Sequence, residues 1–184
     1  MRWIELGAFT TVFRTHEGNI PEVNHQFYSD EKTLSHFIRF ARVYTAWKPY
    51  RMELVKEASE TGLPVLRHPF IHFPYDSEVL GLNYQFMVGS EFMVVPVLNH
   101  GEDTVEVYLP AGNWVHLWSD EKYGSPERGV HETVSAPIGE PAVFYKEGSE
   151  EGRRFKEALE SQGLLWQREG RMDRSGAFGP EGLS

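Results

Sequence analysis

The chain has 184 residues, of which 40% are hydrophobic and 24% charged, so a packed core is possible and wholesale disorder is excluded. Its 27 acidic residues outnumber its 18 Lys and Arg residues, and no basic stripe alternates with aromatic residues, so nucleic-acid binding is not expected. Cysteine is absent, and neither an apolar run of ~18–20 residues nor a signal-peptide pattern occurs, which favours a cytoplasmic protein without a membrane span.

The first twenty residues predict a helix end, a strand and a loop. Residues 3–9 are mostly apolar and have no capping residue before them, so they resemble the end of a buried helix. A domain rarely begins inside such an element, and we therefore expect further chain before it. Residues 10–14 are β-branched and aromatic, which predicts a short strand, and the polar residues 15–21 predict a loop.

The next segment predicts two helices followed by a strand. Ser29 or Asp30 can cap a helix whose apolar residues recur at helical spacing, and Pro49 should kink or restart it. Gly62 is a suitable C-terminal stop. Residues 64–71 predict a strand whose prolines limit its pairing. This order is typical of a parallel α/β unit.

After residue 75 the pattern changes to short strands separated by turns, with no helix between them. This spacing predicts an antiparallel β-sandwich. The expected strands span residues 86–88, 92–98, 104–109, 114–118, 130–135 and 142–146. Residues 150–165 can form an amphipathic helix, and the polar, Gly-rich residues 170–184 are expected to be disordered. We therefore divide the chain into residues 1–78, 79–149 and 150–184.

The candidate site is the loop that follows the first predicted strand. Arg14 and His16 are two residues apart, so on extended chain they share a face, and together they suit a polyhydroxylated or anionic ligand. A buried ion pair of Arg14 with a carboxylate, beside a histidine whose hydrogen bonds are satisfied, fits the residues equally well. Glu17 is a single carboxyl without a visible partner, so a structural role is favoured over general acid or base catalysis.

Two further pairs are weaker candidates. His68 and His72 have the spacing of a metal pair, but Pro69 lies between them and no third ligand is near in sequence. Trp114 and Trp118 could stack on sugar rings, although aromatic residues at this spacing more often fill a sandwich core. No phosphate loop, nucleophile elbow or zinc-protease motif occurs. We expect no catalytic residue, no metal site and no cofactor in this chain.

Several stretches resemble glycoside hydrolase family 31, which contains α-glucosidases, α-xylosidases and sulfoquinovosidases. The similarity begins at Arg2-Trp3, Leu6-Gly7-Ala8-Phe9 and Arg14-Thr15-His16, and continues through residues 44–50 and 60–70. It extends through residues 84–89, 94–98 and 107–118. The resemblance implies the last part of a (β/α)8 barrel, over residues 1–78, followed by a proximal β-sandwich, over residues 79–149.

The resemblance also implies a function and two site residues. The family's nucleophilic Asp and acid/base Asp lie upstream of the Arg-Trp segment, so the chain resembles the C-terminal part of a retaining α-glycosidase that is inactive alone. His16 matches the histidine that binds sugar hydroxyls, and Arg14 matches the arginine beside it. Glu17-Gly18-Asn19 departs from the α-glucosidase form and is closer to the sulfoquinovosidase-like branch. The implied partners are an α-glycoside or oligosaccharide substrate and the missing N-terminal barrel segment.

A second hypothesis is a non-catalytic β-sandwich module, used for carbohydrate binding or interaction, that carries a vestigial piece of a barrel. The two hypotheses differ in what precedes the chain. Upstream sequence that encodes the missing barrel strands would favour the enzyme.

Overall fold

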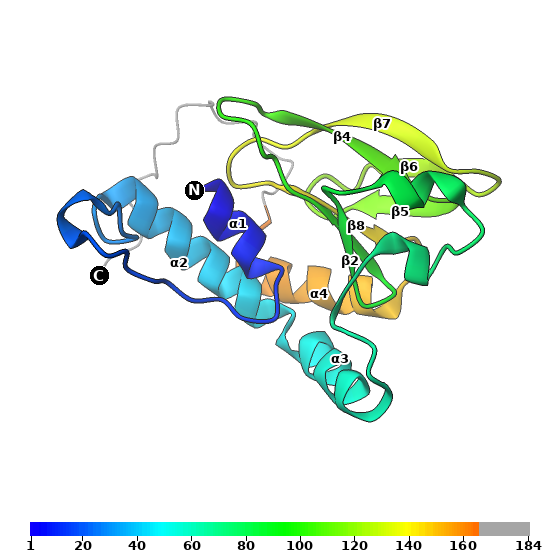
Figure 1. Cartoon of the computed structure of the whole chain (residues 1–184), viewed down its shortest axis with the longest axis horizontal. Helices are drawn as coiled ribbons and strands as arrows, with labels where there is room; N and C mark the ends of the chain where they lie inside the picture. The colour runs from blue at the N-terminus through cyan, green and yellow to red at the C-terminus, as the bar shows by residue number, and fades with distance from the viewer. Residues whose placement is uncertain (166–184) are drawn as a thin grey trace.

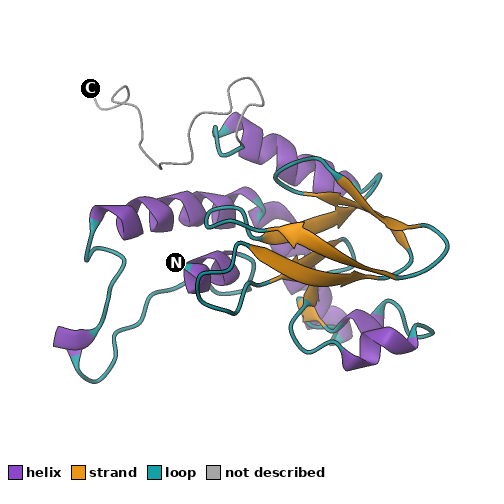
Figure 2. Ribbon diagram, turned by 90° about the horizontal axis from the view of Figure 1, so that it is seen from above, coloured by secondary structure: helices purple, strands orange, loops and turns teal. Residues whose placement is uncertain are grey.

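The computed structural model describes residues 1–165, which form an antiparallel β structure flanked by helices (Figures 1 and 2). The expectation of disorder over residues 170–184 lies outside the described residues. Helices α1 and α2 lie side by side, and α4 contacts α2 (Figure 1). No helix within residues 1–165 is long and apolar enough to cross a membrane. The helices are α1 (Arg2–Ala8), α2 (Glu31–Ala46), α3 (Lys48–Thr61) and α4 (Glu150–Ser161), with 3-10 turns at Pro21–Val23, Pro69–Ile71 and Ser77–Gly81.

The helix boundaries confirm the predicted caps. The Asp30 side chain accepts a hydrogen bond from the Thr33 backbone N–H at 2.8 Å, so Asp30 rather than Ser29 is the N-cap of α2. Trp47 separates α2 from α3, and Pro49 lies in the first turn of α3, where its missing N–H costs nothing. Gly62 ends α3 with a φ of 79°, a left-handed conformation that favours glycine.

Two antiparallel sheets contain all the strands of the described residues. The six-stranded sheet has the order β1-β2-β3-β8-β5-β6, and the second sheet pairs β4 with β7. The pairing of β4 with β7 runs from Thr104 opposite Ser135 to Leu109 opposite Val130. The strands are β1 (Leu66–Arg67), β2 (Phe86–Val88), β3 (Phe92–Val95), β4 (Thr104–Leu109), β5 (Gly112–His116), β6 (Lys122–Ser125), β7 (Val130–Ser135) and β8 (Ala142–Lys146).

Two buried clusters hold these layers together. The first joins the helices to the six-stranded sheet and includes Phe40, Trp47 and Trp118. The second contains side chains from both sheets and includes Met87, Leu109 and Trp114. Trp114 is 1% exposed and Trp118 is 9% exposed. Both tryptophans are therefore core residues, as the favoured interpretation of their spacing stated, and neither ring is available to stack on a sugar.

The sequence prediction was wrong about the first strand, because residues 10–14 form no strand. Thr10 instead closes a turn at the end of α1, where its hydroxyl lies 2.8 Å from the Gly7 carbonyl oxygen. The Phe13 ring packs against helix α2 through Phe37. No strand of the described residues pairs with this segment, and β propensity alone does not make a strand without a pairing partner.

Only two residues of the predicted strand over residues 64–71 form a strand, and this strand pairs antiparallel with β2 instead of in parallel. Proline explains the shortening, because Pro69 begins a 3-10 turn and has no N–H for a ladder. The parallel α/β pattern expected for residues 1–75 is therefore absent from the described residues.

The sequence prediction omits strand β6, because Gly124 and Ser125 are typical turn residues. Gly124 has a φ of +88° and lies opposite Asn113 in the ladder with β5. A Cβ atom at Gly124 would lie 2.4 Å from the Gly112 carbonyl oxygen. Glycine is needed here because the two strands approach too closely for any side chain.

Candidate functional site

The segment that carries Arg14 and His16 leaves helix α1 and returns to the start of helix α2. Its two ends are held by an aromatic stack on α2. The Phe13 ring lies 5.3 Å from the Phe37 ring at an interplanar angle of 19°, and the Phe27 ring lies 4.5 Å from Phe37 at 26°. Such parallel arrangements are favourable contacts between aromatic rings. Residues 14–26 therefore form a loop whose two flanking residues, Phe13 and Phe27, both stack on Phe37.

A hollow of about 490 Å3 lies between this loop and helices α1 and α2. Arg14 and His16 line it from exposed positions, so Arg14 is not in the buried ion pair with a carboxylate that was the alternative. Its remaining lining is mostly apolar and includes Phe13, Phe27 and Phe37. Apolar walls with a few polar groups at the edge are typical of a small-molecule site.

His25 is a polar member of this hollow that the sequence interpretation missed. Its Nε2 atom lies 2.9 Å from Asp30 Oδ2 and 3.0 Å from the Thr33 hydroxyl. The pKa of Asp30 is held below its ordinary value, chiefly because the backbone N–H and then the hydroxyl of Thr33 donate to the carboxylate, with a smaller contribution from His25. The sequence signal that could have identified His25 is a histidine in the loop that precedes the capping Asp of a helix.

Two contacts within the loop bring its outgoing and returning halves together. The Gln26 Nε2 atom donates to the His16 carbonyl oxygen at 3.5 Å, at the limit of a hydrogen bond. A Cβ atom at Gly18 would lie 2.9 Å from Asn24 Oδ1, so glycine permits this close approach. The Asn24 Nδ2 atom is buried and has no hydrogen-bond partner in the described part of the chain.

The described lining of the hollow offers hydrogen-bonding and cationic groups and no carboxyl group. Its lining offers a guanidinium, two imidazoles and an amide, which suit hydroxyl or anionic groups. None of the lining residues among those described is Asp or Glu, and Glu17 is exposed outside it. Glycoside hydrolysis typically requires two carboxyl groups on either side of the scissile bond.

His68 and His72 do not converge on a common point. The His68 Nε2 atom bonds the Leu82 carbonyl oxygen at 2.9 Å, whereas His72 Nε2 lies 3.4 Å from an Arg67 guanidinium nitrogen. Burial, and then the neighbouring Arg67, lowers the pKa of His72. Within residues 1–165 no group of three potential metal-ligating side chains occurs. Each histidine thus has a partner within the protein.

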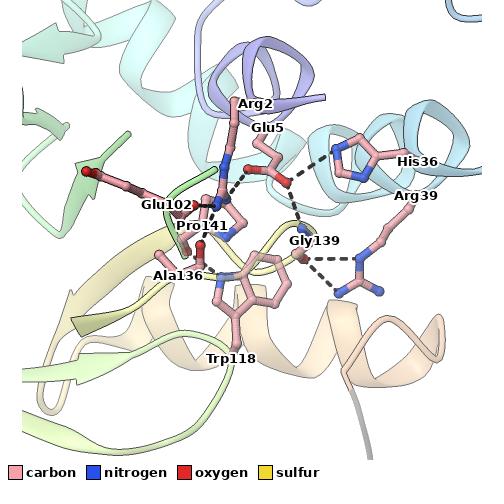
Figure 3. A network of polar contacts seen from close by, with 9 residues as sticks. All are labelled: Arg2, Glu5, His36, Arg39, Glu102, Trp118, Ala136, Gly139 and Pro141. Atoms are coloured by element: carbon pink, nitrogen blue, oxygen red, sulfur yellow. Dashed lines mark hydrogen bonds and ion pairs between the residues drawn. The ribbon is translucent and has the colours of Figure 1, made fainter. Parts of the chain in front are cut away.

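A buried polar network fixes α1, and with it the start of the site segment, to the turn between β7 and β8 (Figure 3). Glu5 is 2% exposed and accepts from the Arg2 guanidinium at 2.9 Å and from the Gly139 backbone N–H at 2.7 Å. His36 Nε2 lies 3.4 Å from Glu5 Oε1, within ion-pair distance but without a hydrogen bond.

The network extends to the backbone just before β4, to the turn between β7 and β8, and to α2. Arg2 also donates to the carbonyl oxygens of Glu102 and Ala136, each at 2.7 Å. Arg39 on α2 donates to the Gly139 carbonyl oxygen at 3.3 Å, and its guanidinium lies 5.5 Å from the centre of the Trp118 ring (Figure 3). Helices α1 and α2 are thereby bonded to the same turn.

Comparison with known proteins finds that the chain is similar to glycoside hydrolases. The model of the glycosyl hydrolase family 31 C-terminal domain matches residues 62–149. This match is supported by relatives and solved structures of the same family along most of the chain. Residues 62–149 therefore match the C-terminal domain of glycosyl hydrolase family 31, and the chain is similar to members of that family along most of its length.

Three relatives indicate the range of the similarity. A sulfoquinovosidase of Escherichia coli is 44% identical over 150 residues, which are 82% of this chain and 22% of that protein. Alpha-glucosidase 2 of Bacillus thermoamyloliquefaciens is 32% identical over 80% of this chain and 18% of its own length. The structure of a family 31 sulfoquinovosidase from E. rectale, in complex with an aza-sugar inhibitor, has a TM-score of 0.81 and 39% identity, covering 87% of this chain and 23% of that one. The chain thus spans about a fifth of the length of these relatives.

Proposed function

We propose that this chain is the C-terminal part of a retaining α-glycoside hydrolase, in which Arg14 and His16 bind the sugar and the catalytic Asp pair lies upstream. The observation that carries the proposal is the composition of the hollow: it offers cationic and hydrogen-bonding groups, while none of its described lining residues is a carboxylic acid. A retaining mechanism needs two carboxyls ~5–5.5 Å apart, one as nucleophile and one as acid and base. Both would come from the preceding part of the barrel.

We also propose that the substrate is a sulfoquinovoside rather than a neutral glucoside or xyloside. Identity to the sulfoquinovosidases, at 44% and 39%, exceeds the 32% identity to the α-glucosidase. The exposed guanidinium of Arg14 is compatible with a substrate that carries an anionic group. The Thr15-His16-Glu17-Gly18-Asn19 sequence of the loop supports the same branch of the family.

The proposed function fits a division of the chain into a barrel end, residues 1–78, and a β-sandwich, residues 79–149. Seven of the eight strands lie after residue 78, and side chains from both sheets share one core. The first part supplies three helices and the two-residue strand β1. The absence of cysteine supports a reducing, cytoplasmic location.

The first prediction concerns hydrolysis by residues 1–184 alone and by the same residues preceded by the proposed barrel segment. We expect no turnover of aryl α-glucoside, α-xyloside or α-sulfoquinovoside by the chain alone, because it lacks the carboxyl pair. The extended polypeptide should hydrolyse the sulfoquinovoside fastest.

The Glu17→Gln variant is the control, because Glu17 is the carboxyl nearest in sequence to His16. Turnover by residues 1–184 that disappears in this variant would contradict the proposal. Binding of a glycoside by the chain, together with an inactive extended polypeptide, would instead favour a non-catalytic carbohydrate-binding module.

A further inference from the structure

We propose that Phe37 on α2 is a positioning residue that fixes the positions of Arg14 and His16. The identity of the ligand rests on the proposed function, but the effect of Phe37 on the position of the loop does not. Phe13 and Phe27, the residues that flank the loop 14–26, both stack on the Phe37 ring, at 5.3 and 4.5 Å. One side chain therefore holds both ends of the segment that carries the binding groups.

The first end of the loop is fixed from several directions. A Cβ atom at Gly7 would lie 3.1 Å from the Phe13 ring, so α1 packs closely against that ring. The Tyr44 ring lies 5.4 Å from Phe13, and the Tyr44 hydroxyl donates to the Thr11 carbonyl oxygen at 2.8 Å. Helices α1 and α2 therefore give Phe13, the residue next to Arg14, a defined position.

The middle of the loop has few contacts of its own. Residues 14–20 are all exposed and contain no helix or strand. The hydrogen bond from Gln26 to the His16 carbonyl oxygen is long, at 3.5 Å, and the Gln26 backbone N–H donates to the Ser29 hydroxyl at 2.8 Å. Since the ends are anchored and the middle is not, the positions of Arg14 and His16 depend on the contacts at the two ends. Removal of the Phe37 ring takes away the one contact that both ends share.

Trypsin can report this on residues 1–184, because Arg14 is the only Lys or Arg between Arg2 and Lys32. We expect Phe37→Ala to accelerate cleavage after Arg14 by roughly tenfold, the size expected for losing two aromatic contacts. Phe37→Tyr should restore the wild-type rate because it keeps the ring. Ile38→Ala, on the same helix at a position that is 51% exposed, is the matched control and should leave the rate unchanged.

Cleavage after Arg67 provides an internal reference for unfolding of the whole chain, because its side chain is 3% exposed. Preferential acceleration at Arg14 supports the proposal. Equal acceleration at Arg14 and Arg67, in Phe37→Ala and in the milder Phe37→Leu, would overturn it by showing that the ring supports the fold in general. An Arg14 rate in Phe37→Ala no higher than in Ile38→Ala would also overturn it.

The extended polypeptide separates this inference from the proposed function. There, Phe37→Ala should lower kcat/KM by roughly tenfold, and Phe37→Tyr should rescue it. If the extended wild type is inactive, the proposed function fails while the trypsin experiment still tests the role of Phe37. If the wild type is active and Phe37→Ala has the same kcat/KM as Ile38→Ala, the inference is wrong and the function remains.

Discussion

Replacing Glu5 by Ala is expected to lower the free energy of unfolding by about 2–4 kcal/mol. Glu5 is buried and accepts from both the Arg2 guanidinium and the Gly139 backbone N–H. Alanine removes the acceptor of the Gly139 N–H and of one Arg2 guanidinium nitrogen at part-buried positions, and a donor left unpaired there is costly. Urea unfolding at neutral pH would measure the difference between the variant and the wild type.

Two further variants show whether the loss comes from this network. Glu5→Gln keeps an oxygen for Gly139 but removes the charge facing Arg2, so we expect an intermediate loss. Glu22→Ala removes an exposed carboxyl and should leave stability within about 0.5 kcal/mol of the wild type. A Glu5→Ala variant as stable as Glu22→Ala would show that the network does not hold α1 to the β7–β8 turn.

Acidification from pH 7 to pH 4 should destabilise the protein through His116. Burial lowers the pKa of His116 to about 4, against a smaller opposing effect of Glu121. Its Nδ1 atom lies 2.9 Å from the Ser119 hydroxyl, while its Nε2 atom is buried without a hydrogen-bond partner among the described residues. The remaining ring neighbours are Tyr123 and Phe144, which cannot stabilise a positive charge by ion pairing.

Acidification lowers the stability because the unfolded chain binds the proton at a higher pH than the folded chain does. Below pH 6.5 the unfolded chain protonates this histidine while the folded chain does not, so stability falls until the pH reaches about 4. The full loss from this one group corresponds to roughly 3 kcal/mol. Above pH 6.5 the histidine is neutral in both states and contributes no pH dependence.

Urea unfolding at several pH values between 7 and 4 measures this loss. Burial likewise lowers the pKa of His36 to about 4, so the wild type should lose stability from both groups. His116→Phe should therefore show a shallower dependence than the wild type, and His100→Gln, at an exposed position, should not. Identical pH dependence in His116→Phe and wild type would contradict the assigned role of burial.

The sequence predicted the helices and most strands because these depend on local signals. Four predicted strands, 86–88, 104–109, 130–135 and 142–146, match the observed bounds, and Asp30 and Gly62 cap helices as expected. The errors arose where pairing partners decide the structure. Residues 10–14 have strand propensity but no neighbouring strand within the described chain, and Gly124 suggested a turn although close strand approach requires it.

The site was predictable only in part. Arg14 and His16 were chosen from their spacing, and they line one hollow. His25 and Phe37 line the same hollow, but they lie on the returning part of the loop and on a helix, so no local pattern linked them to His16. The buried network of Glu5 joins residues more than a hundred positions apart. Such long-range contacts follow from the fold and not from sequence spacing.

The most direct test of the proposed sugar site compares His16→Ala with His72→Ala in the extended polypeptide. A site that bonds a sugar hydroxyl loses ~1–3 kcal/mol when the donor is removed, and the loss should appear in the chemical step, where the sugar ring flattens. We therefore expect His16→Ala to cut kcat/KM by roughly ten- to a few hundred-fold. His72→Ala, whose ring contacts Arg67 away from the hollow, should retain it. With matching melting temperatures, wild-type kcat/KM in His16→Ala would show that residues 14–19 are not the sugar site.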